Sequence, residues 1–504
     1  MNAIHNVASW RISRSTLAVG ICLALGACAV GPNYQRPAAP AGQSYAPTPM
    51  PQTTASASGP GGNAQQFVRE MDIPGQWWTL FHSEPLNALV DDSLKHNPDL
   101  AAAQHALKAA WENVYAQRGA YFPEVDAGVN STRQKIAGTL ASPAFSGATF
   151  YSLTTAQLSI SYTPDLWGSN RRQVESLVAQ ADVQRFQLEA TYLTLTTNLV
   201  NAAVGEASLR AQIAATQDMI DSQSKILDTN RRQFSLGDVA ESDIASQEAT
   251  LEQTRATLPP LQKQLAQQRD LLAVLSGRSP DQDVPAHFEL DALQLPQDLP
   301  MSLPARLVEQ RPDVRVADAQ LHAACAQVGV AFAARLPNIQ ITANWGSATD
   351  QMHSLFGSGT GFWNLGAAIT EPIFDAGTLK HRQRAAEATY RQAAEQYRST
   401  VMSALQNVAD SLHAVQSDAE AMAATARAEQ AAARSLSIAQ KQFALGDISM
   451  VALLNAQVTY RQAELALIQA RAARYADTVA LFQALGGGWW NRKDVVAAPG
   501  VPAQ

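Results

Sequence analysis

Cysteine is scarce in this sequence, which has only Cys22, Cys28 and Cys325 among its 504 residues. Two of the three lie close to the N-terminus, so the chain cannot hold a framework of disulfide bonds. Cys325 stands between two alanines in a helical pattern. We therefore expect it to be a small buried hydrophobe and not a reactive thiol.

Blocks of like charge and long apolar runs are also missing. The net charge is −7 and the charges are dispersed, which argues against nucleic acid as a partner. No run of about 18 apolar residues occurs, so no transmembrane helix is expected. Aromatic residues make up only 7% of the chain while alanine and glutamine are abundant, a composition typical of long helices.

Catalytic motifs are absent as well. The nine histidines form no His-Glu-x-x-His pair, and His96 and His105 are too far apart for one. Neither a Gly-x-Ser-x-Gly elbow nor a Walker loop occurs. The glycine-rich run 357–361 precedes a strand pattern, whereas a phosphate cradle needs a helix there. We expect no enzyme activity, no metal site and no bound cofactor.

The first 27 residues have the pattern of an export signal. Arg11 and Arg14 form a basic region, and Leu17–Leu25 is an apolar region too short to span a membrane. The signal ends in Leu25-Gly26-Ala27-Cys28, which resembles the lipobox of bacterial lipoproteins. That resemblance makes Cys28 the first mature residue, with N-acyl and S-diacylglycerol chains attached. The alternative is an ordinary signal with an incidental cysteine.

Four segments, arranged as two similar pairs, alternate strictly between apolar and polar residues. In the first, Val125, Ala127 and Val129 are separated by polar or small residues, and the other three repeat this pattern. Period two predicts a β-strand with one apolar and one polar face. Each segment is close to the roughly 9–11 residues that a membrane-crossing strand needs. We predict two membrane-crossing hairpins.

The body of the chain, the two hairpins included, is an internal duplication. Pro98-Asp99 matches Pro312-Asp313, and Gln233–Asp238 matches Gln442–Asp447. Each half should run helix, strand, loop, strand, long helix, turn and helix.

The expected divisions follow the chain in order. Residues 1–27 form the signal, 28–68 an extended linker without a core of its own, 69–120 helices, and 121–166 the first hairpin. Residues 167–335 form long helices with a connector at 277–300 and the start of the second half, 336–374 the second hairpin, 375–488 long helices, and 489–504 a tail.

Apolar residues recur every seven positions along the helical segments. One series is Tyr192, Leu199, Ile213, Ile220, Leu227 and Phe234, its companion is Leu188, Leu195, Ala202 and Leu209, and the returning segment has Ile244, Leu251, Leu258, Leu265 and Leu272. Sustained heptads predict helices that wind about each other. The pattern over 168–232 corresponds to roughly 100 Å of unbroken helix. Pro259-Pro260 should kink the returning helix.

Each long helix should reverse at a Leu-Gly-Asp turn. Gly237 and Gly446 suit the left-handed conformation that ends a helix. Asp238 and Glu241 are placed for a capping box, and Asp447 is placed to cap the second returning helix. Both turns should be exposed.

Four strands cannot close a membrane barrel, because the smallest such barrels have about eight. An open edge in lipid would leave backbone groups without partners. Several copies must therefore share one barrel in the outer membrane, with loops 134–149 and 349–360 facing outside. Glu124, Asp126 and Asp165 would face the lumen, although a place at the polar strand ends is equally open for Glu124 and Asp165.

Five parts of the chain have the residues of a known family, namely Cys28–Pro37, Trp77-Trp78 with Asn97–Leu100, Asp165–Gly168, Leu453–Gln457 and Ala484–Trp489. In these segments the chain resembles the outer membrane factor family, the TolC-like exit ducts, and within it the OprM/NodT-type efflux lipoproteins. The resemblance extends over nearly all of residues 17–490. The string after the lipobox is its most specific part.

The resemblance implies an α+β fold, in which a homotrimer forms a twelve-stranded outer-membrane β-barrel, four strands per chain, continued by a coiled-coil helical tunnel through the periplasm. It implies a periplasmic adaptor protein and an inner-membrane pump of the resistance-nodulation-division class as partners, beside outer-membrane lipid. The chain would be a passive exit duct for drugs and other small toxic compounds. A duct for peptide or protein secretion and a structural lipoprotein without a pore are the alternatives.

The resemblance also indicates two groups of site residues. The adaptor-contacting tips are Leu236, Gly237, Asp238, Leu445, Gly446 and Asp447, and the periplasmic gate is Phe443, Asp447, Ala452 and Asn455. Phe443 lacks the hydroxyl of the family's usual tyrosine, and Ala452 and Asn455 occupy positions where the family commonly has aspartates. A neutral ring attracts cations less than a ring of carboxylates. We therefore expect a resting gate with weak cation preference.

Overall fold

The computed structural model describes residues 29–40, 42, 44–45, 50–140, 149–237 and 239–493. Cys28 and Asp238 lie outside these ranges. The chain forms two compact units. Unit 1 contains the N-terminal residues to Arg36 together with Leu107–Val183 and Ala317–Tyr397, and unit 2 contains Pro37–Ala106, Gln184–Val316 and the residues from Arg398 onward.

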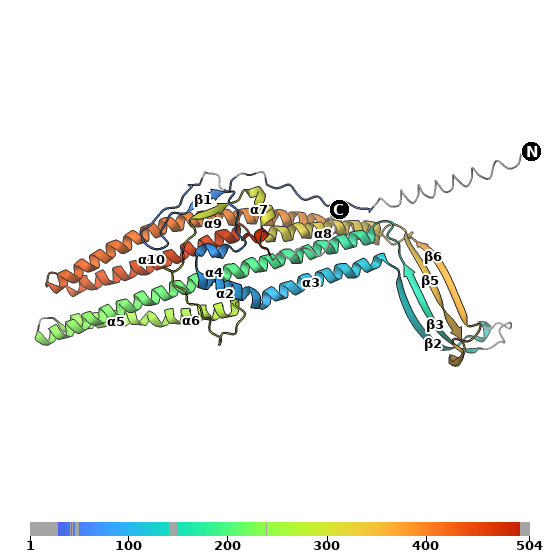
Figure 1. The fold of residues 1–504 in the computed structure, drawn as a ribbon, viewed down its shortest axis with the longest axis horizontal. Coiled ribbons are helices and arrows are strands. Elements are labelled where there is room, and N and C mark those ends of the chain that lie inside the picture. The colour runs from blue at the N-terminus through green and yellow to red at the C-terminus, as the bar shows by residue number, and fades with distance from the viewer. Residues whose placement is uncertain are drawn as a thin grey trace, which may run out of the picture. The chain divides into compact units, whose positions relative to one another are not determined.

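Unit 1 contains a four-stranded antiparallel sheet in the order β2-β3-β5-β6 (Figure 1). Its strands are β2 (Glu124–Lys135), β3 (Phe150–Tyr162), β5 (Asn338–Thr349) and β6 (Gly361–Thr370). Val125 lies opposite Ile160, and Trp345 lies opposite both Leu158 and Trp363. The alternating apolar residues that the sequence singled out in the four strands therefore share one face, and the strand predictions are confirmed.

The helices repeat between the two halves of the chain. α3 (Pro98–Arg118) and α8 (Pro312–Ala333) each begin at a proline, whose fixed φ and missing N–H suit a first helical position. α4 (Ser169–Leu236) has 68 residues and α9 (Thr378–Ala444) has 67. These matched lengths confirm the duplication. No helix in the described part of the chain is long and apolar enough to span a membrane.

Shorter elements complete the fold. They are β1 (Gln66–Arg69), η1 (Trp77–Phe81), α2 (Glu84–His96), η2 (Gly119–Tyr121), η3 (Gly138–Leu140), β4 (Asp298–Met301), α7 (Pro304–Gln310), η5 (Met352–Ser354) and η6 (Trp489–Asn491). β1 pairs with β4 in parallel.

The predicted heptads pack as a seam in unit 2. Ile220 and Leu227 of α4 form a buried cluster with Leu251, and Ile244 and Leu258 pack against it. Phe234, the last member of the α4 series, is 45% exposed. It lies in the final turn of α4, where the helix is about to reverse.

The returning helix of the first half is interrupted where the sequence predicts a kink. α5 (Glu241–Ala256) ends just before Thr257, and α6 (Leu258–Leu275) starts with Pro259 and Pro260 in its first turn. Proline lacks the N–H that would continue the α5 ladder, so a new helix begins there. The counterpart in the second half, α10 (Met450–Ala484), is one unbroken helix of 35 residues.

The expectation that residues 28–68 lack any core needs a correction for their last part. Thr54 and Gln65 are buried, and Arg474 of α10 donates to Thr54 Oγ1 at 3.2 Å. The same guanidinium donates to the carbonyls of Gly61 and Asn63 at 3.0 and 2.7 Å. A buried guanidinium needs acceptors, and this segment supplies them from far away in the sequence.

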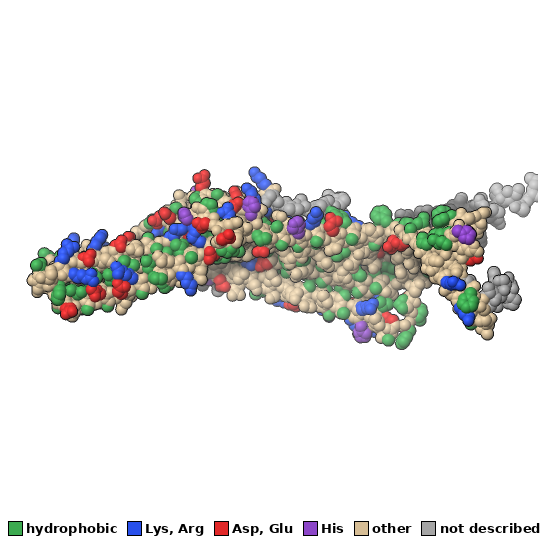
Figure 2. Space-filling model, turned by 90° about the horizontal axis from the view of Figure 1, so that it is seen from below, with side chains coloured by type: hydrophobic (Ala, Val, Ile, Leu, Met, Phe, Trp, Pro, Cys, Tyr) green, Lys and Arg blue, Asp and Glu red, His purple; other side chains and the backbone are tan. Residues whose placement is uncertain are grey.

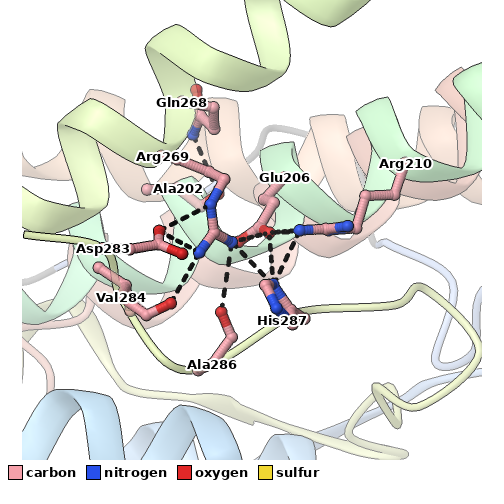
Figure 3. A network of polar contacts seen from close by, with 9 residues as sticks. All are labelled: Ala202, Glu206, Arg210, Gln268, Arg269, Asp283, Val284, Ala286 and His287. Atoms are coloured by element: carbon pink, nitrogen blue, oxygen red, sulfur yellow. Dashed lines mark hydrogen bonds and ion pairs between the residues drawn. The ribbon is translucent and has the colours of Figure 1, made fainter.

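The connector after α6 is fastened by a polar network (Figure 3). Glu206 of α4 is buried, and its Oε1 lies 2.7 Å from both Arg210 Nη2 and Arg269 Nη1. Arg269 also pairs with Asp283 and donates to the Val284 carbonyl at 2.7 Å. The network joins the connector to α4 and α6 within unit 2.

Candidate functional site

The sheet of unit 1 has two chemically different faces. On one face Trp345, Trp363 and Leu365 are 67%, 76% and 71% exposed. On the other, Asn344 Nδ2 donates to Asn364 Oδ1 at 3.0 Å, and the neighbouring side chains are polar. An exposed apolar face of this extent marks contact with lipid or protein. A sheet with these two faces is suited to separate lipid from water.

The two outer strands of this sheet have unpaired edges. Among the described residues β2 pairs only with β3, and β6 pairs only with β5. These strands have 12 and 10 residues, so each edge presents a row of backbone N–H and C=O groups. Apolar surroundings could not hydrogen-bond to such an edge. In a single chain, the described sheet therefore leaves the outer edges of β2 and β6 without backbone partners.

Two aspartates cap the helices that follow the hairpins. Asp165 accepts hydrogen bonds from the backbone N–H groups of Asn170 and Arg171 at 3.0 and 2.9 Å. Asp375 accepts from those of Leu379 and Gly377, both at 2.8 Å, and these bonds lower the pKa of its carboxyl. Asp165 is therefore a cap at a strand end and not a lumenal strand residue.

Asp375 was not among the predicted residues, although an aspartate just ahead of a long helix pattern is a usable signal. Glu124 and Asp126 lie on the polar face of β2, opposite Ser161 and Ser159. Glu124 is also the first residue of β2, so it stands at a strand end as well.

The two Leu-Gly turns are exposed, as predicted. Leu236 and Leu445 are 76% and 77% exposed. Gly237 and Gly446 have φ of +88° and +80°, the left-handed conformation that favours glycine. A Cβ added at either glycine would meet no atom within 4 Å. Each half of the chain thus presents one large apolar side chain beside an open turn.

Charged side chains of both signs lie around these turns. Figure 2 shows Lys, Arg, Asp and Glu interspersed over the end of unit 2 that holds α5. Arg231 and Glu248 form one exposed pair there, at 2.7 Å. The turns therefore combine an apolar centre with a mixed charged border.

The predicted helix caps at these turns are wrong. The N-cap of α10 is Ser449, whose Oγ accepts from the Ala452 N–H at 3.3 Å, while Asp447 is exposed in the turn. Ser449 was visible in the sequence as a favoured N-cap residue. At the first turn Glu241 is the first residue of α5, so it cannot be the third residue of a capping box with Asp238.

The residues predicted to form the gate lie together at the second turn. Phe443 packs against the buried cluster of Ala439, Met450, Leu453 and Leu454. Asp447, Ala452 and Asn455 are exposed, and Ala452 lines a groove of about 460 Å³ between α9 and α10. In the described ranges, no group of three or more His, Cys, Asp or Glu is arranged to hold a metal ion.

A family model and several known proteins match this chain over most of its length. The family model described as "Outer membrane efflux protein" matches residues 89–278 and 303–487. The toluene efflux pump outer membrane protein TtgC of Pseudomonas putida is 29% identical over 489 residues, covering 95% of this chain and 97% of that protein. The pyoverdine export outer membrane protein OpmQ of the same species is 27% identical over 447 residues, covering 88% and 94%.

Solved structures show the same fold. The outer-membrane channel OprN is 26% identical and superimposes with a TM-score of 0.80, covering 92% of this chain and 100% of that one. The sheet with its apolar face and the duplicated long helices are therefore those of an outer-membrane channel. The chain belongs to the outer membrane efflux protein family and acts as an efflux duct of the outer membrane.

Proposed function

We propose that three copies of this chain form the exit duct of a tripartite efflux assembly, with one twelve-stranded barrel in the outer membrane and a helical tunnel through the periplasm. The observation that supports this most strongly is a four-stranded sheet with an apolar face and two unpaired edges. Joining β6 of one copy to β2 of the next satisfies both edges. Three copies then give twelve strands, an even number as in other bacterial barrels.

Disulfide trapping between edge strands tests this assembly. Ala127→Cys on β2 is combined in turn with Leu365→Cys, Ala367→Cys and Ile369→Cys on β6 in the full-length protein. Oxidation should produce covalent trimers for one register of the two strands. The matched control is Ile160→Cys with the same β6 partners, because β3 is an inner strand and should give no links between chains. Monomers from every β2–β6 pair would contradict the proposal.

The two Leu-Gly turns are the docking surface for a periplasmic adaptor protein in this proposal. The exposure of Leu236 and Leu445 at equivalent positions of the two halves supports the assignment. Gly237, Asp238, Gly446 and Asp447 complete the same two turns. Replacing Leu236 and Leu445 by serine should abolish co-purification with the adaptor and leave the trimer intact. Leu445→Met, which keeps the apolar volume, should retain adaptor binding.

In this proposal the duct itself is passive, and a pump of the resistance-nodulation-division class supplies energy and selects the cargo. The two relatives named above differ in cargo, which is toluene for one and pyoverdine for the other. Ducts of this kind therefore work with pumps whose cargo differs chemically. We therefore propose small toxic compounds, including drugs, as the cargo here. No catalytic step is assigned to the chain.

Gene deletion with a susceptibility panel of drugs, dyes and solvents tests the cargo class. Increased susceptibility that a plasmid copy restores is the expected result. Unchanged susceptibility together with loss of a secreted peptide or protein would favour the secretion duct. Absence of conductance in a planar bilayer would favour a structural lipoprotein without a pore.

We also propose that Cys28 is lipidated. The residues just after it are held on α8 within unit 1, where Arg36 Nη2 lies 2.7 Å from Asp318 Oδ2 and the Tyr34 and His322 rings stack with centroids 4.4 Å apart. A fixed chain directly after the lipid would hold the protein at a set height on the membrane. Incorporation of labelled palmitate that is lost in Cys28→Ser is the expected result, and labelling that persists in Cys28→Ser would contradict the assignment.

A further inference from the structure

Two basic residues stand on the apolar face of the sheet. The odd-numbered residues of β2 share one face, so Arg133 and Lys135 lie on the same side as Val125 and Val129. Both basic side chains are exposed, and Lys135 Nζ lies 5.2 Å from the centroid of the Phe150 ring across the strand pair. The apolar face, which otherwise suits lipid, therefore carries two cations at the C-terminal end of β2.

These cations occupy one end of the sheet only, the end at which the hairpin loops lie (Figure 1). Glu124 and Asp126 are at the other end of β2 and on the opposite face. The loop 134–149 contains no acidic residue, and in the described ranges no ion pair involves Arg133 or Lys135. The second loop has one acidic residue, Asp350, whose Oδ1 accepts a hydrogen bond from Thr349 Oγ1 at 3.4 Å. Within the described ranges neither basic residue is paired with an acidic one.

A groove lies on the same face, about half-way along β2, and Val129 is the β2 residue of its lining that stands nearest to Arg133. It has a volume of about 350 Å³, and its lining includes the small residues Ala127, Ala156 and Gly346 together with the larger Trp345 and Phe356. Phe356 of the second loop is 83% exposed. At about 30 Å³ for a group the size of water, the groove has room for on the order of ten methylene groups.

We propose that this face binds a phosphorylated, multiply acylated lipid of the outer leaflet, with its phosphate on Arg133 and Lys135 and one acyl chain in the groove. Guanidinium and ammonium groups pair strongly with phosphate, and a membrane interface weakens screening by water. The inference rests on the proposed function, because the apolar face must meet the lipid and the loops must face outside. It goes beyond that function by assigning a lipid class to a defined place on the wall.

The competing interpretation is that the two long side chains extend to the interface and contact any headgroup. Native mass spectrometry of the detergent-extracted full-length trimer separates the two. The probes are diphosphorylated hexa-acyl lipid A, its dephosphorylated form, phosphatidylethanolamine and inorganic phosphate. We expect the diphosphorylated lipid to be retained at lower concentration than the other three.

Charge variants identify the residues. Arg133→Gln with Lys135→Gln should weaken retention of the diphosphorylated lipid about tenfold or more, since each lost ionic hydrogen bond is worth at least that factor. The matched control is Lys380→Gln with Arg382→Gln, which removes two exposed charges from α9 and should leave retention unchanged. Arg133→Lys with Lys135→Arg should retain the lipid, which shows that the site and not the fold was altered.

A groove variant tests the acyl chain separately. Ala127→Phe should reduce lipid retention while assembly into trimers, followed on semi-native gels, stays normal. Equal retention of all lipids, or no effect of the charge variants, would overturn the proposal. Competition by inorganic phosphate at the same concentration would mean a free-anion site and would overturn it too. If retention fails while bilayer conductance persists, the lipid site is wrong and the duct stands; loss of both would count against the duct.

Discussion

At the scale of single residues, Asn455 is the residue through which we expect to change the charge of the proposed inner gate. It is exposed on the first turns of α10, beside Ala452 and close to Asp447. Asn455→Asp would place three carboxylates in a ring of the trimer, which should raise the preference for cations over anions severalfold. Reversal potentials of single channels in a salt gradient measure this. Asn455→Gln is the neutral control, and strong cation selectivity already present in the unchanged protein would contradict the weak cation preference expected of this gate.

Asp418 of α9 has a carboxyl pKa that is raised in the folded state. Burial raises the pKa of this carboxyl to about 6. The hydrogen bond with Asp477 on α10 and the negative charge of Asp477 act in the same direction, and Arg474 acts in the opposite one. The unfolded value is about 3.9, so the folded state binds the proton more tightly. Stability is therefore lost as pH rises from about 4 to about 6, and this loss is complete above that window.

Asp418→Asn should remove this effect. We expect a higher midpoint of chemical unfolding than in the unchanged protein at pH 7, and the difference should disappear below about pH 4. Tryptophan fluorescence during guanidinium titration at several pH values gives the measurement. A variant that is not more stable than the parent at pH 7 would show that the folded state does not raise the pKa of Asp418.

At the scale of elements, the connector depends on one buried carboxylate. Glu206 holds Arg210 and Arg269 together, and Arg269 in turn holds Asp283 and Val284 of the connector (Figure 3). Glu206→Ala leaves two guanidinium groups without their shared partner, and breaking such a pair costs about 3 kcal/mol. The unfolding midpoint should fall, and proteolysis within 277–300 should become faster.

The control for this element is an exposed pair of the same chemistry. Glu252 and Arg255 lie 2.7 Å apart on the surface of α5, and such pairs contribute at most about 1 kcal/mol. Glu252→Ala should therefore change stability little. Equal effects of the two substitutions would show that the buried network does not fasten the connector.

At the scale of the whole molecule, the proposed trimer depends on which face of the sheet meets the lipid. Leu365 and Asn364 are neighbours on β6, and they lie on opposite faces of the sheet. Arginine on a lipid-facing strand position costs roughly 2–4 kcal/mol near the bilayer centre, whereas lumenal positions tolerate charge. Leu365→Arg should therefore lower the amount of assembled trimer in outer membranes, with Asn364→Arg close to normal. Semi-native gels of membrane fractions measure this, and the reverse order would invert the assigned faces.

The sequence by itself determined the features that depend on near neighbours along the chain. Period-two alternation located the four strands, heptads located the α4–α5 seam, and glycine located both turns, since each of these follows from local backbone geometry and from the side chains a few positions away. The burial of Cys325, which is 1% exposed, was also predictable from its helical and apolar surroundings.

Only the tertiary structure decided the features that join distant residues. The pairing of β3 with β5, the docking of residues 54–65 on Arg474 and the network around Glu206 all unite segments far apart in the sequence. The helix cap of α10 also depended on the tertiary structure. The helix begins at Met450, and this starting point makes Ser449 the cap instead of Asp447. A hydrogen bond or an ion pair forms where three-dimensional packing places its two partners, and periodicity along one segment carries no information about the second partner.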